Sequence, residues 1–218
     1  MKVKTTGRVL KRAAGRASEK FDGEAPEQVV GRAELKLKEA VKAFSYDFRG
    51  KVVLDIGSST GGFTELALRL GASRVVAVEK GTKQMKAPLR FDERVELYEK
   101  TDIFEFRVPE EIEARGGLDV ILADVSFVSL RKVLAYARKN LASRKTDFLV
   151  MLKPQFEAGE GQLVRGVVKN EKMRREIMRG FEEWLRGNGF LILKKRDNET
   201  VGKVGGNRER FYWLKLAK

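Results

Sequence analysis

Residues 52–63 constrain the fold of this chain most strongly, because they join a buried strand to a glycine loop and a helix. Residues 52–54 (Val-Val-Leu) form a short apolar run of the kind that makes a buried strand. Asp55 follows this run, and a loop of small residues then leads into a helix predicted over residues 63–70. This order of elements brings backbone N–H groups and a helix N-terminus close to a ligand.

The loop has the spacing Asp-x-Gly-x-x-x-Gly-Gly, which differs from the Gly-x-Gly-x-x-Gly of a dinucleotide site. Asp55 would repel a pyrophosphate, but it would attract a positively charged sulfonium that carries an amino acid. The pattern therefore resembles the first motif of S-adenosylmethionine methyltransferases, and a glycine turn without a ligand is the alternative. The resemblance implies cofactor contacts from Asp55 and from the loop residues Gly57, Ser58, Ser59, Thr60, Gly61, Gly62 and Phe63.

Strands and helices alternate along the rest of the chain. Apolar runs predict strands over residues 74–78, 94–99, 118–123, 147–152, 190–193 and 211–216. Helical spacing predicts helices over residues 29–44, 84–90, 130–141 and 173–185, with Asn170 as a cap of the last one. The expected fold is α/β and Rossmann-like, of the methyltransferase type. Its mostly parallel seven-stranded sheet carries helices on both faces and an antiparallel final strand.

Charged side chains stand at the predicted carboxyl ends of the strands, where open α/β sheets bind their ligands. Glu79 follows the second strand and can accept hydrogen bonds from both ribose hydroxyls of an adenosyl ligand, although a surface glutamate is the alternative. Lys80 comes next to it, and Thr101 and Asp102 stand where an adenine amino group needs an acceptor. The fourth and fifth strands end at Asp124 and Lys153, and Pro154 predicts an extended backbone at Lys153.

Composition excludes several chemistries. The 218 residues include no cysteine and no histidine, which rules out disulfides, thiolate metal sites and the commonest general base. Acid–base chemistry must therefore use Lys, Asp, Glu or Tyr, and no metal is expected. No apolar run is long enough to span a bilayer, and the basic first twenty residues lack the apolar stretch of a signal peptide, so we expect a cytoplasmic protein.

The chain is strongly basic, with 45 Lys and Arg against 31 Asp and Glu and a net charge of +14. Such an excess favours a polyanionic partner, most often a nucleic acid, and weak nonspecific basicity is the alternative. The composition also fits a heat-adapted protein, but heat adaptation raises Glu together with Lys and does not explain the excess. Residues 1–28 are predicted to be a basic arm or a solvated tail, and residues 29–218 to form the methyltransferase domain.

These residues resemble the TlyA-type (hemolysin A-like) proteins within the FtsJ-like ribose methyltransferases. The pairing of Asp-Val-Ser-Phe-Val-Ser-Leu at 124–130 with Lys-Pro-Gln-Phe-Glu at 153–157 is specific. The resemblance extends over about residues 29–216. The stretches that carry it are 31–37, 54–64, 123–130, 152–157, 166–168 and 206–211.

The resemblance implies methyl transfer from S-adenosylmethionine to a ribose 2′-hydroxyl, that of cytidines in ribosomal RNA or ribosomal subunits. It also implies a catalytic tetrad at Lys36, Asp124, Lys153 and Glu209. Members of the family usually carry an N-terminal S4 RNA-binding domain, and residues 1–28 are too short for a complete one. These residues are expected to be a remnant of that domain or an unrelated arm, and oligomeric state is left open.

The chemistry of the reaction agrees with this tetrad. Ribose hydroxyls are weak acids, so their attack on a sulfonium methyl needs in-line positioning and help with the proton. Without histidine, Lys153 is the expected base or hydroxyl-orienting residue, and Asp124 and Glu209 orient the lysines. The alternative for each member is an ion pair at the sheet edge.

Basic residues close to this edge in sequence are expected to contact RNA phosphates, namely Arg32, Lys203, Arg208 and Arg210. Phe127, Phe156 or Tyr212 would stack on a base or belong to the core. Three competing functions are a methyltransferase of a small molecule, a membrane-active hemolysin and a non-catalytic ribosome-assembly factor. The small-molecule enzyme does not need a net charge of +14, and the hemolysin needs a membrane-active segment that the sequence lacks.

Overall fold

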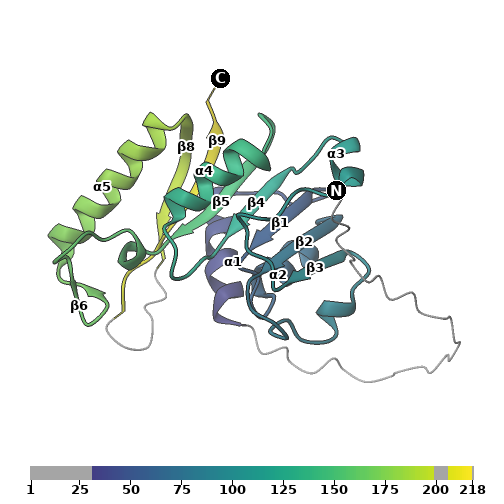
Figure 1. The fold of residues 1–218 in the computed structure, drawn as a ribbon, viewed down its shortest axis with the longest axis horizontal. Helices are drawn as coiled ribbons and strands as arrows, with labels where there is room; N and C mark the ends of the chain where they lie inside the picture. Colours follow the sequence, from purple (N-terminus) through teal and green to yellow (C-terminus); the bar gives the residue numbers. More distant parts are fainter. Residues whose placement is uncertain (1–30, 199–205, 218) are drawn as a thin grey trace, which may run out of the picture.

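The computed structural model describes residues 31–198 and 206–217, and one mixed sheet of seven strands forms its centre (Figure 1). The strand order is β3-β2-β1-β4-β5-β9-β8. The strands are β1 (Val52–Ile56), β2 (Arg74–Glu79), β3 (Val95–Glu99), β4 (Val120–Ala123), β5 (Asp147–Leu152), β8 (Phe190–Asp197) and β9 (Arg210–Leu216). Strands β1 to β5 are parallel, and β9 is antiparallel to both of its neighbours. The predicted fold class is therefore confirmed.

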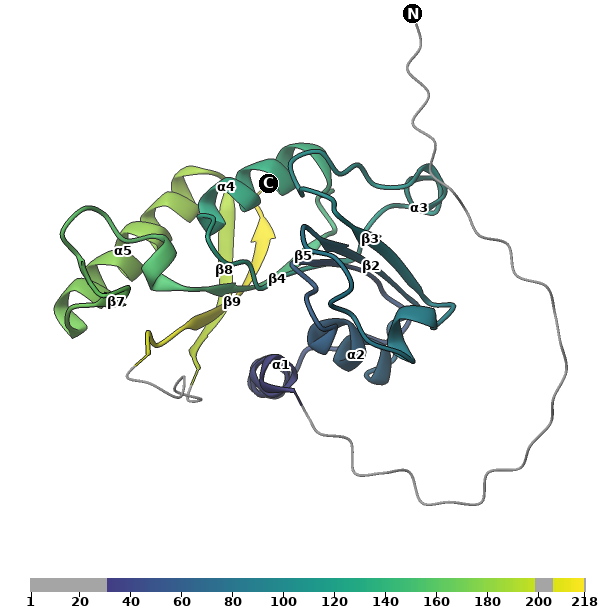
Figure 2. The same ribbon diagram turned by 60° about the horizontal axis from the view of Figure 1, so that its bottom comes forward.

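Helices cover both faces of the sheet (Figure 2). One face carries α3, α4 and α5, and the other carries α1 and α2. Their bounds are α1 (Arg32–Phe44), α2 (Gly62–Arg69), α3 (Glu110–Ala114), α4 (Leu130–Asn140) and α5 (Glu171–Gly187). This layering leaves the strand ends free to form the rims of the molecule.

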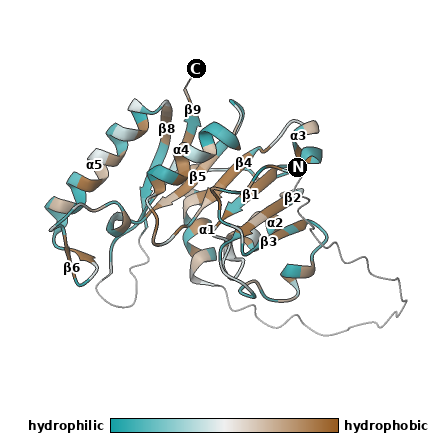
Figure 3. Ribbon diagram, in the orientation of Figure 1, coloured by the Kyte–Doolittle hydropathy of each residue, from teal (hydrophilic) through white to brown (hydrophobic). Residues whose placement is uncertain are grey.

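The central strands of the sheet are apolar (Figure 3). Every residue of β4 and β5 is buried, as expected for parallel strands that are covered on both sides. Successive side chains enter opposite layers: Phe148 and Val150 pack under α4 and α5, whereas Leu149 and Met151 pack against α1 and α2. The two layers fix the sheet rigidly, so the strand ends stand in defined positions.

Caps place the two helices that begin near the carboxyl edge. Asn170 caps α5 as predicted, because its Oδ1 accepts a hydrogen bond from the N–H of Met173 at 2.9 Å. Ser129 caps α4 in the same way, with its side chain accepting from the N–H of Arg131. Helix α4 therefore begins six residues after Asp124, which ties the position of this helix to the candidate site.

The structure differs from the sequence predictions in four segments. Residues 84–90 are not a helix, and only a 3-10 turn forms at Leu89–Phe91, because Pro88 has no N–H and disfavours helical backbone at residue 87. The glycine loop after β5 contains a 3-10 turn (Pro154–Phe156) and a hairpin, β6 (Leu163–Val164) with β7 (Val167–Val168). Positive φ at both Arg165 and Gly166 allows this two-residue turn.

Helix α3 was not predicted, and β8 runs four residues further than expected. Residues 1–28 and Lys203 lie outside the described residues.

Candidate functional site

The glycine loop between β1 and α2 depends on one close backbone approach. Gly57 has φ +77°, which favours glycine. A Cβ at this position would lie 3.2 Å from the backbone oxygen of Asp124 and 3.6 Å from Cγ1 of Val125. The loop therefore lies directly against the segment that follows β4, and a larger residue would push the two apart.

Asp55 lies beneath this loop. Its side chain is 1% exposed, and its Oδ2 accepts a hydrogen bond from the hydroxyl of Thr64 at 2.7 Å. Burial raises the pKa of Asp55 to about 7, and the nearby Asp124 carboxylate also raises it, whereas the Thr64 hydrogen bond lowers it. The structure places this carboxyl where it supports the start of α2.

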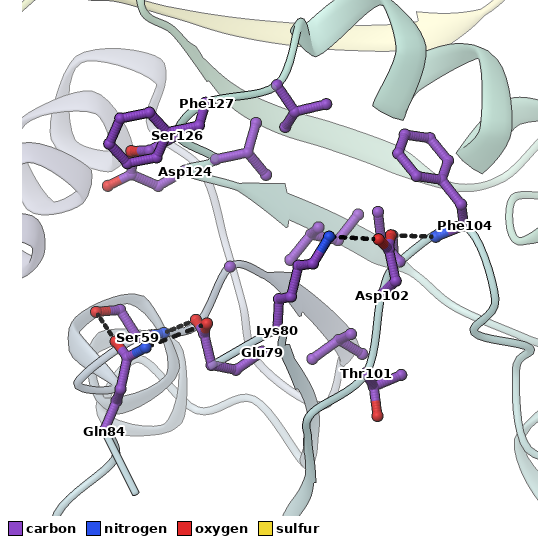
Figure 4. Close-up of a pocket in the computed structure, with 16 residues that line it drawn as sticks. Ser59, Glu79, Lys80, Gln84, Thr101, Asp102, Phe104, Asp124, Ser126 and Phe127 are labelled. Carbon is purple, nitrogen blue, oxygen red and sulfur yellow. Dashed lines mark hydrogen bonds and ion pairs between the residues drawn. The ribbon is translucent and has the colours of Figure 1, made fainter. Parts of the chain in front are cut away.

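A cavity of about 670 Å³ opens beside the loop, within the range of small-molecule sites (Figure 4). Its walls come from the ends of β1, β2, β3 and β4. Of the predicted cofactor residues, those that line the cavity are Gly57, Ser59, Glu79, Lys80, Thr101, Asp102 and Asp124. The other predicted residues do not line the cavity: Asp55 is in β1, Ser58, Thr60 and Gly61 are in the loop, and Gly62 and Phe63 are in α2.

Two acids in the cavity wall are held by hydrogen bonds. Glu79 accepts from the backbone N–H of Ser59 at 2.9 Å and from that of Gly81 at 2.6 Å, so it joins the glycine loop to the end of β2. Lys80 pairs with Asp102 at 2.9 Å (Figure 4). The hydrogen bond and charge of Lys80 lower the pKa of Asp102, which keeps that carboxylate ionised.

Lys153 and Asp124 meet at the rim of this cavity. Their Nζ and Oδ1 atoms are 2.6 Å apart, and the Lys153 ammonium also donates a hydrogen bond to Oγ of Ser126 at 2.8 Å. Lys153 is extended (φ −102°, ψ 105°), and Pro154 follows it, as predicted. Both side chains are largely buried yet partly open, at 12% and 17% exposure. A lysine ammonium is thus fixed beside the cavity by two oxygens.

Lys36 and Glu209 form a second ion pair, with 2.6 Å between Nζ and Oε2. Lys36 comes from α1, and Glu209 directly precedes β9, so the pair joins the two ends of the described chain. The structure thus resolves the predicted tetrad into two lysine–carboxylate pairs. The sheet-edge ion pair that was the alternative for each member is present, and it is compatible with a catalytic arrangement.

The sequence did not single out Glu157, which joins the two segments of this rim. Its side chain is 2% exposed. One oxygen accepts from the hydroxyl of Ser129 at 2.9 Å, and the other from the backbone N–H of Leu130 at 2.5 Å. Arg131 lies 3.3 Å away, and burial nevertheless raises the pKa of Glu157. The contacts hold the segment of Lys153 against that of Asp124. These contacts join residues that are 27 and 28 positions apart in the sequence, so no local sequence pattern reveals them.

The residues predicted to stack on a base or to contact phosphates differ in exposure and in their partners within the fold. Phe127 is 93% exposed at the cavity rim, with its ring 5.3 Å from that of Phe156, whereas Tyr212 is fully buried and belongs to the core. Arg208 is exposed, and the guanidinium of Arg210 binds Asp197 at 2.5 Å and Glu182 at 3.2 Å. Arg210 is therefore used within the fold. Arg32 opens α1.

The cavity fits a nucleoside cofactor such as S-adenosylmethionine. Gly57 and Asp124 both line the cavity, and acids also stand in its wall at Glu79 and Asp102. Within the described residues, Oδ1 of Asp55 and Oγ of Ser58 are buried without a hydrogen-bond partner. Buried polar atoms of this kind ordinarily have a partner, so a ligand or water bound at this loop would complete their bonding.

A doubly wound sheet with this glycine loop, acid-lined cavity and lysine–carboxylate rim defines an α/β methyltransferase. The sequence model of the family described as FtsJ-like methyltransferase matches residues 29–215. The chain belongs to this family.

Named relatives support the assignment. The chain is 36% identical over 167 residues to YqxC of Bacillus subtilis, with 76% of this chain and 58% of that protein covered. It is 38% identical to the 16S/23S rRNA (cytidine-2′-O)-methyltransferase TlyA of Mycobacterium tuberculosis, over 85% of this chain and 68% of the relative. A solved structure of a hemolysin-named protein from Streptococcus thermophilus superposes with a TM-score of 0.79 at 31% identity, covering 90% of this chain and 70% of the other. The resemblance seen in the sequence is confirmed.

Residues 31–198 and 206–217 contain neither a membrane-spanning helix nor a metal-binding cluster. No helix in these ranges has the length and apolar character needed to cross a membrane. No group of three or more carboxylates, histidines or cysteines in the same ranges is arranged to hold a metal ion.

Proposed function

We propose that this chain transfers a methyl group from S-adenosylmethionine to a ribose 2′-hydroxyl of ribosomal RNA, with cytidine as the nucleoside. The observation that carries the proposal is the Lys153–Asp124 pair with Ser126 at the rim of the cofactor cavity. Membership of the FtsJ-like family and the printed activity of the TlyA relative support the same reaction. A protein that acts on ribosomal RNA would work in the cytoplasm.

The cavity residues have binding roles in this proposal. The glycine loop and Ser59 would approach the amino-acid end of the cofactor, Glu79 its ribose hydroxyls, and Asp102 its adenine. When bound, S-adenosylmethionine supplies a methyl group on a cationic sulfur. Excluding water from a cavity of this kind strengthens the attraction between that charge and the nearby carboxylates.

The rim residues have catalytic roles. The ribose oxygen forms a bond to the methyl carbon as the carbon–sulfur bond breaks, and the hydroxyl proton leaves the oxygen. Lys153 would orient the hydroxyl by donating a hydrogen bond to its oxygen, or, in the neutral amine form, take its proton, and Asp124 would hold the lysine in position. Lys36 and Glu209, the other two members of the tetrad that the resemblance implies, would act on the same ribose as a second donor–acceptor pair.

The net charge of +14 favours RNA over a small acceptor, because a small-molecule methyltransferase gains nothing from a strongly basic surface. Exposed Phe127, which lines the cavity, is suited to stack on a base that has left its helix. Arg208 precedes Glu209 and is exposed, and a phosphate would compete with its 4.0 Å ion pair to Glu171.

The test is methyl transfer from labelled S-adenosylmethionine to unmodified ribosomal subunits, naked ribosomal RNA, DNA and a panel of small hydroxylated acceptors. We expect label in RNA, recovered as 2′-O-methylcytidine after digestion to nucleosides. Label in a base, or only in a small acceptor, would refute the proposal. Absence of label from every RNA, in a protein shown to bind S-adenosylmethionine by calorimetry, would refute it as well.

A further inference from the structure

A second hollow, of about 650 Å³, lies at the sheet edge opposite the candidate site. It is formed where α4 ends, β8 begins and β9 ends, next to the loop that precedes β5. The candidate site lies at the opposite edge of the sheet, after the carboxyl ends of β4 and β5. We call this hollow the basic groove, and its polar residues are Arg138, Lys139, Arg144 and Asn188.

The three cations of the basic groove form no ion pair within the described ranges. Each is exposed, and in the described ranges no carboxylate lies within 4.0 Å of its charged group. Basic residues nearby behave differently, since Lys145 pairs with Asp119 and Arg186 with Glu182. Within the described ranges, these two neighbours are therefore neutralised, whereas the three cations of the groove are not.

Arg138 is seated against a glycine. Gly189 has φ +74°, and a Cβ on it would lie 3.0 Å from Nη2 and 3.3 Å from Cζ of Arg138. The guanidinium therefore rests over a turn that has no side chain to displace it. A structural explanation exists for part of the cluster, because cations in the last turn of α4 stabilise the helix dipole. That explanation does not reach Arg144, which lies beyond the helix end at Asn140.

We propose that the basic groove binds the phosphate backbone of the RNA substrate, away from the nucleotide that is methylated; this rests on the proposed function. Three unpaired cations in a concave surface suit successive phosphates, which carry the charge that dominates nucleic-acid affinity. Phe190, the aromatic residue that lines the groove, is buried, so its ring is not exposed to stack on a base. The contact is with the backbone and does not read sequence.

The distance between groove and site sets the size of the RNA. Strand β5 has six residues at about 3.3 Å each, so the two ends are roughly 20 Å apart. A duplex rises about 3.4 Å per base pair, so roughly six base pairs separate the two contacts. The groove therefore selects an extended or folded RNA, and a short oligonucleotide around the target cannot reach it.

The test compares two triple variants that each remove three positive charges. The groove variant is Arg138→Gln, Lys139→Gln and Arg144→Gln. The control replaces exposed cations elsewhere, Lys42→Gln, Lys86→Gln and Arg115→Gln. The probes are a folded ribosomal RNA fragment that contains the target, a target oligonucleotide of about three residues, which is too short to reach the groove, and intact ribosomal subunits. Binding is measured across a range of salt concentrations, with S-adenosylmethionine affinity as a check of folding.

For the groove variant we expect the Kd for the folded fragment to rise about tenfold or more near 0.15 M salt. The slope of log K against log salt becomes shallower by about 2 to 3, one for each lost phosphate contact. The control variant stays within about threefold of the unmodified protein, and both variants bind the short oligonucleotide equally.

Other outcomes overturn the inference. If both variants lose affinity equally, net charge alone is responsible. If the groove variant loses affinity for subunits but not for naked RNA, the groove binds a ribosomal protein. A failure of the proposed function is measured in a different assay from a failure of this inference. The proposed function fails if the unmodified protein transfers no methyl group, whatever RNA the two variants bind.

Discussion

The two halves of the carboxyl edge are built by different means. In the cofactor half, after β1 and β2, the backbone does the positioning: Gly57 lies against the backbone of Asp124, and Glu79 accepts from two backbone N–H groups. In the acceptor half, after β4 and β5, side chains do it, through Lys153 with Asp124 and through Glu157 with Ser129 and Leu130.

This contrast indicates how each half would fail. A site that backbone contacts position is lost when a substitution forces the backbone to move, so the backbone conformation and the room for a side chain matter most in the cofactor half. A side-chain site is lost when a charge or hydrogen bond is removed, even if the backbone stays in place. The same kind of substitution should therefore reduce cofactor affinity in the first half and turnover in the second.

The largest effect is expected for Lys153→Ala. Removing the ammonium leaves the hydroxyl without its base or orienting group, and such groups contribute about 10²- to 10⁴-fold to rate. Methyl transfer should fall by roughly a thousandfold, while S-adenosylmethionine affinity from calorimetry changes less than about threefold. Full activity in a variant that still binds the cofactor would contradict the assigned role.

Asp55→Asn tests the buried carboxyl of the cofactor half. The folded-state pKa of Asp55 is raised to about 7 from 3.8, so its neutral form is favoured in the folded protein. Its contribution to stability is therefore complete below pH 3.8 and is lost as pH rises through about 7. We compare the free energy of unfolding of the ligand-free wild type with that of the ligand-free Asp55→Asn variant. The difference, wild type minus variant, should fall by a few kcal/mol between pH 4 and pH 7.

Denaturant titrations at several pH values measure this difference. Asp47→Asn is the control, because Asp47 is exposed and its hydrogen bonds with Arg49 lower its pKa to about 2. Its contribution is lost only as pH falls toward 2, so its curve should run parallel to wild type between pH 4 and 7. Parallel curves for Asp55→Asn would show that Asp55 stays ionised in the folded state.

Gly57→Ala tests the backbone approach itself. The new Cβ would meet the Asp124 oxygen at 3.2 Å and sit at positive φ, which together cost about 1–3 kcal/mol. We expect the melting temperature to fall by about 3–10 °C and S-adenosylmethionine to bind about tenfold more weakly. Gly50→Ala is the matched control, since Gly50 has φ +69° but nothing within 4 Å of its Cβ position. Equal loss of cofactor affinity in both variants would refute the crowding argument.

Glu157→Gln is expected to have the smallest effect of the four. The substitution keeps the shape but removes the charge that holds Ser129 and Leu130, worth about 1.5–3 kcal/mol for a charge-assisted bond. Turnover should fall about tenfold with KM for S-adenosylmethionine unchanged, because the cofactor half is separate. Glu160→Gln, an exposed change on the same segment, should have no effect. A rise in KM for the cofactor without a change in turnover would break the division between the halves.

The sequence determined the parts of this protein that depend on neighbouring residues. The apolar runs at 147–152 and 74–78, the cap at Asn170 and the strand–loop–helix at 52–63 all follow local rules, so the α/β fold and its carboxyl edge could be predicted. The acids at the strand ends were found for the same reason, because parallel strands bring their carboxyl ends to one edge.

Tertiary structure decided the partners. It paired Lys153 with Asp124 and Lys36 with Glu209, bound Glu157 to the start of α4, and used Arg210 inside the fold while leaving Arg138, Lys139 and Arg144 open. These contacts join residues far apart in the chain, and a charged side chain carries no local signal of which opposite charge it will meet. Only the packing of the sheet and its helices brings a given pair within hydrogen-bond distance.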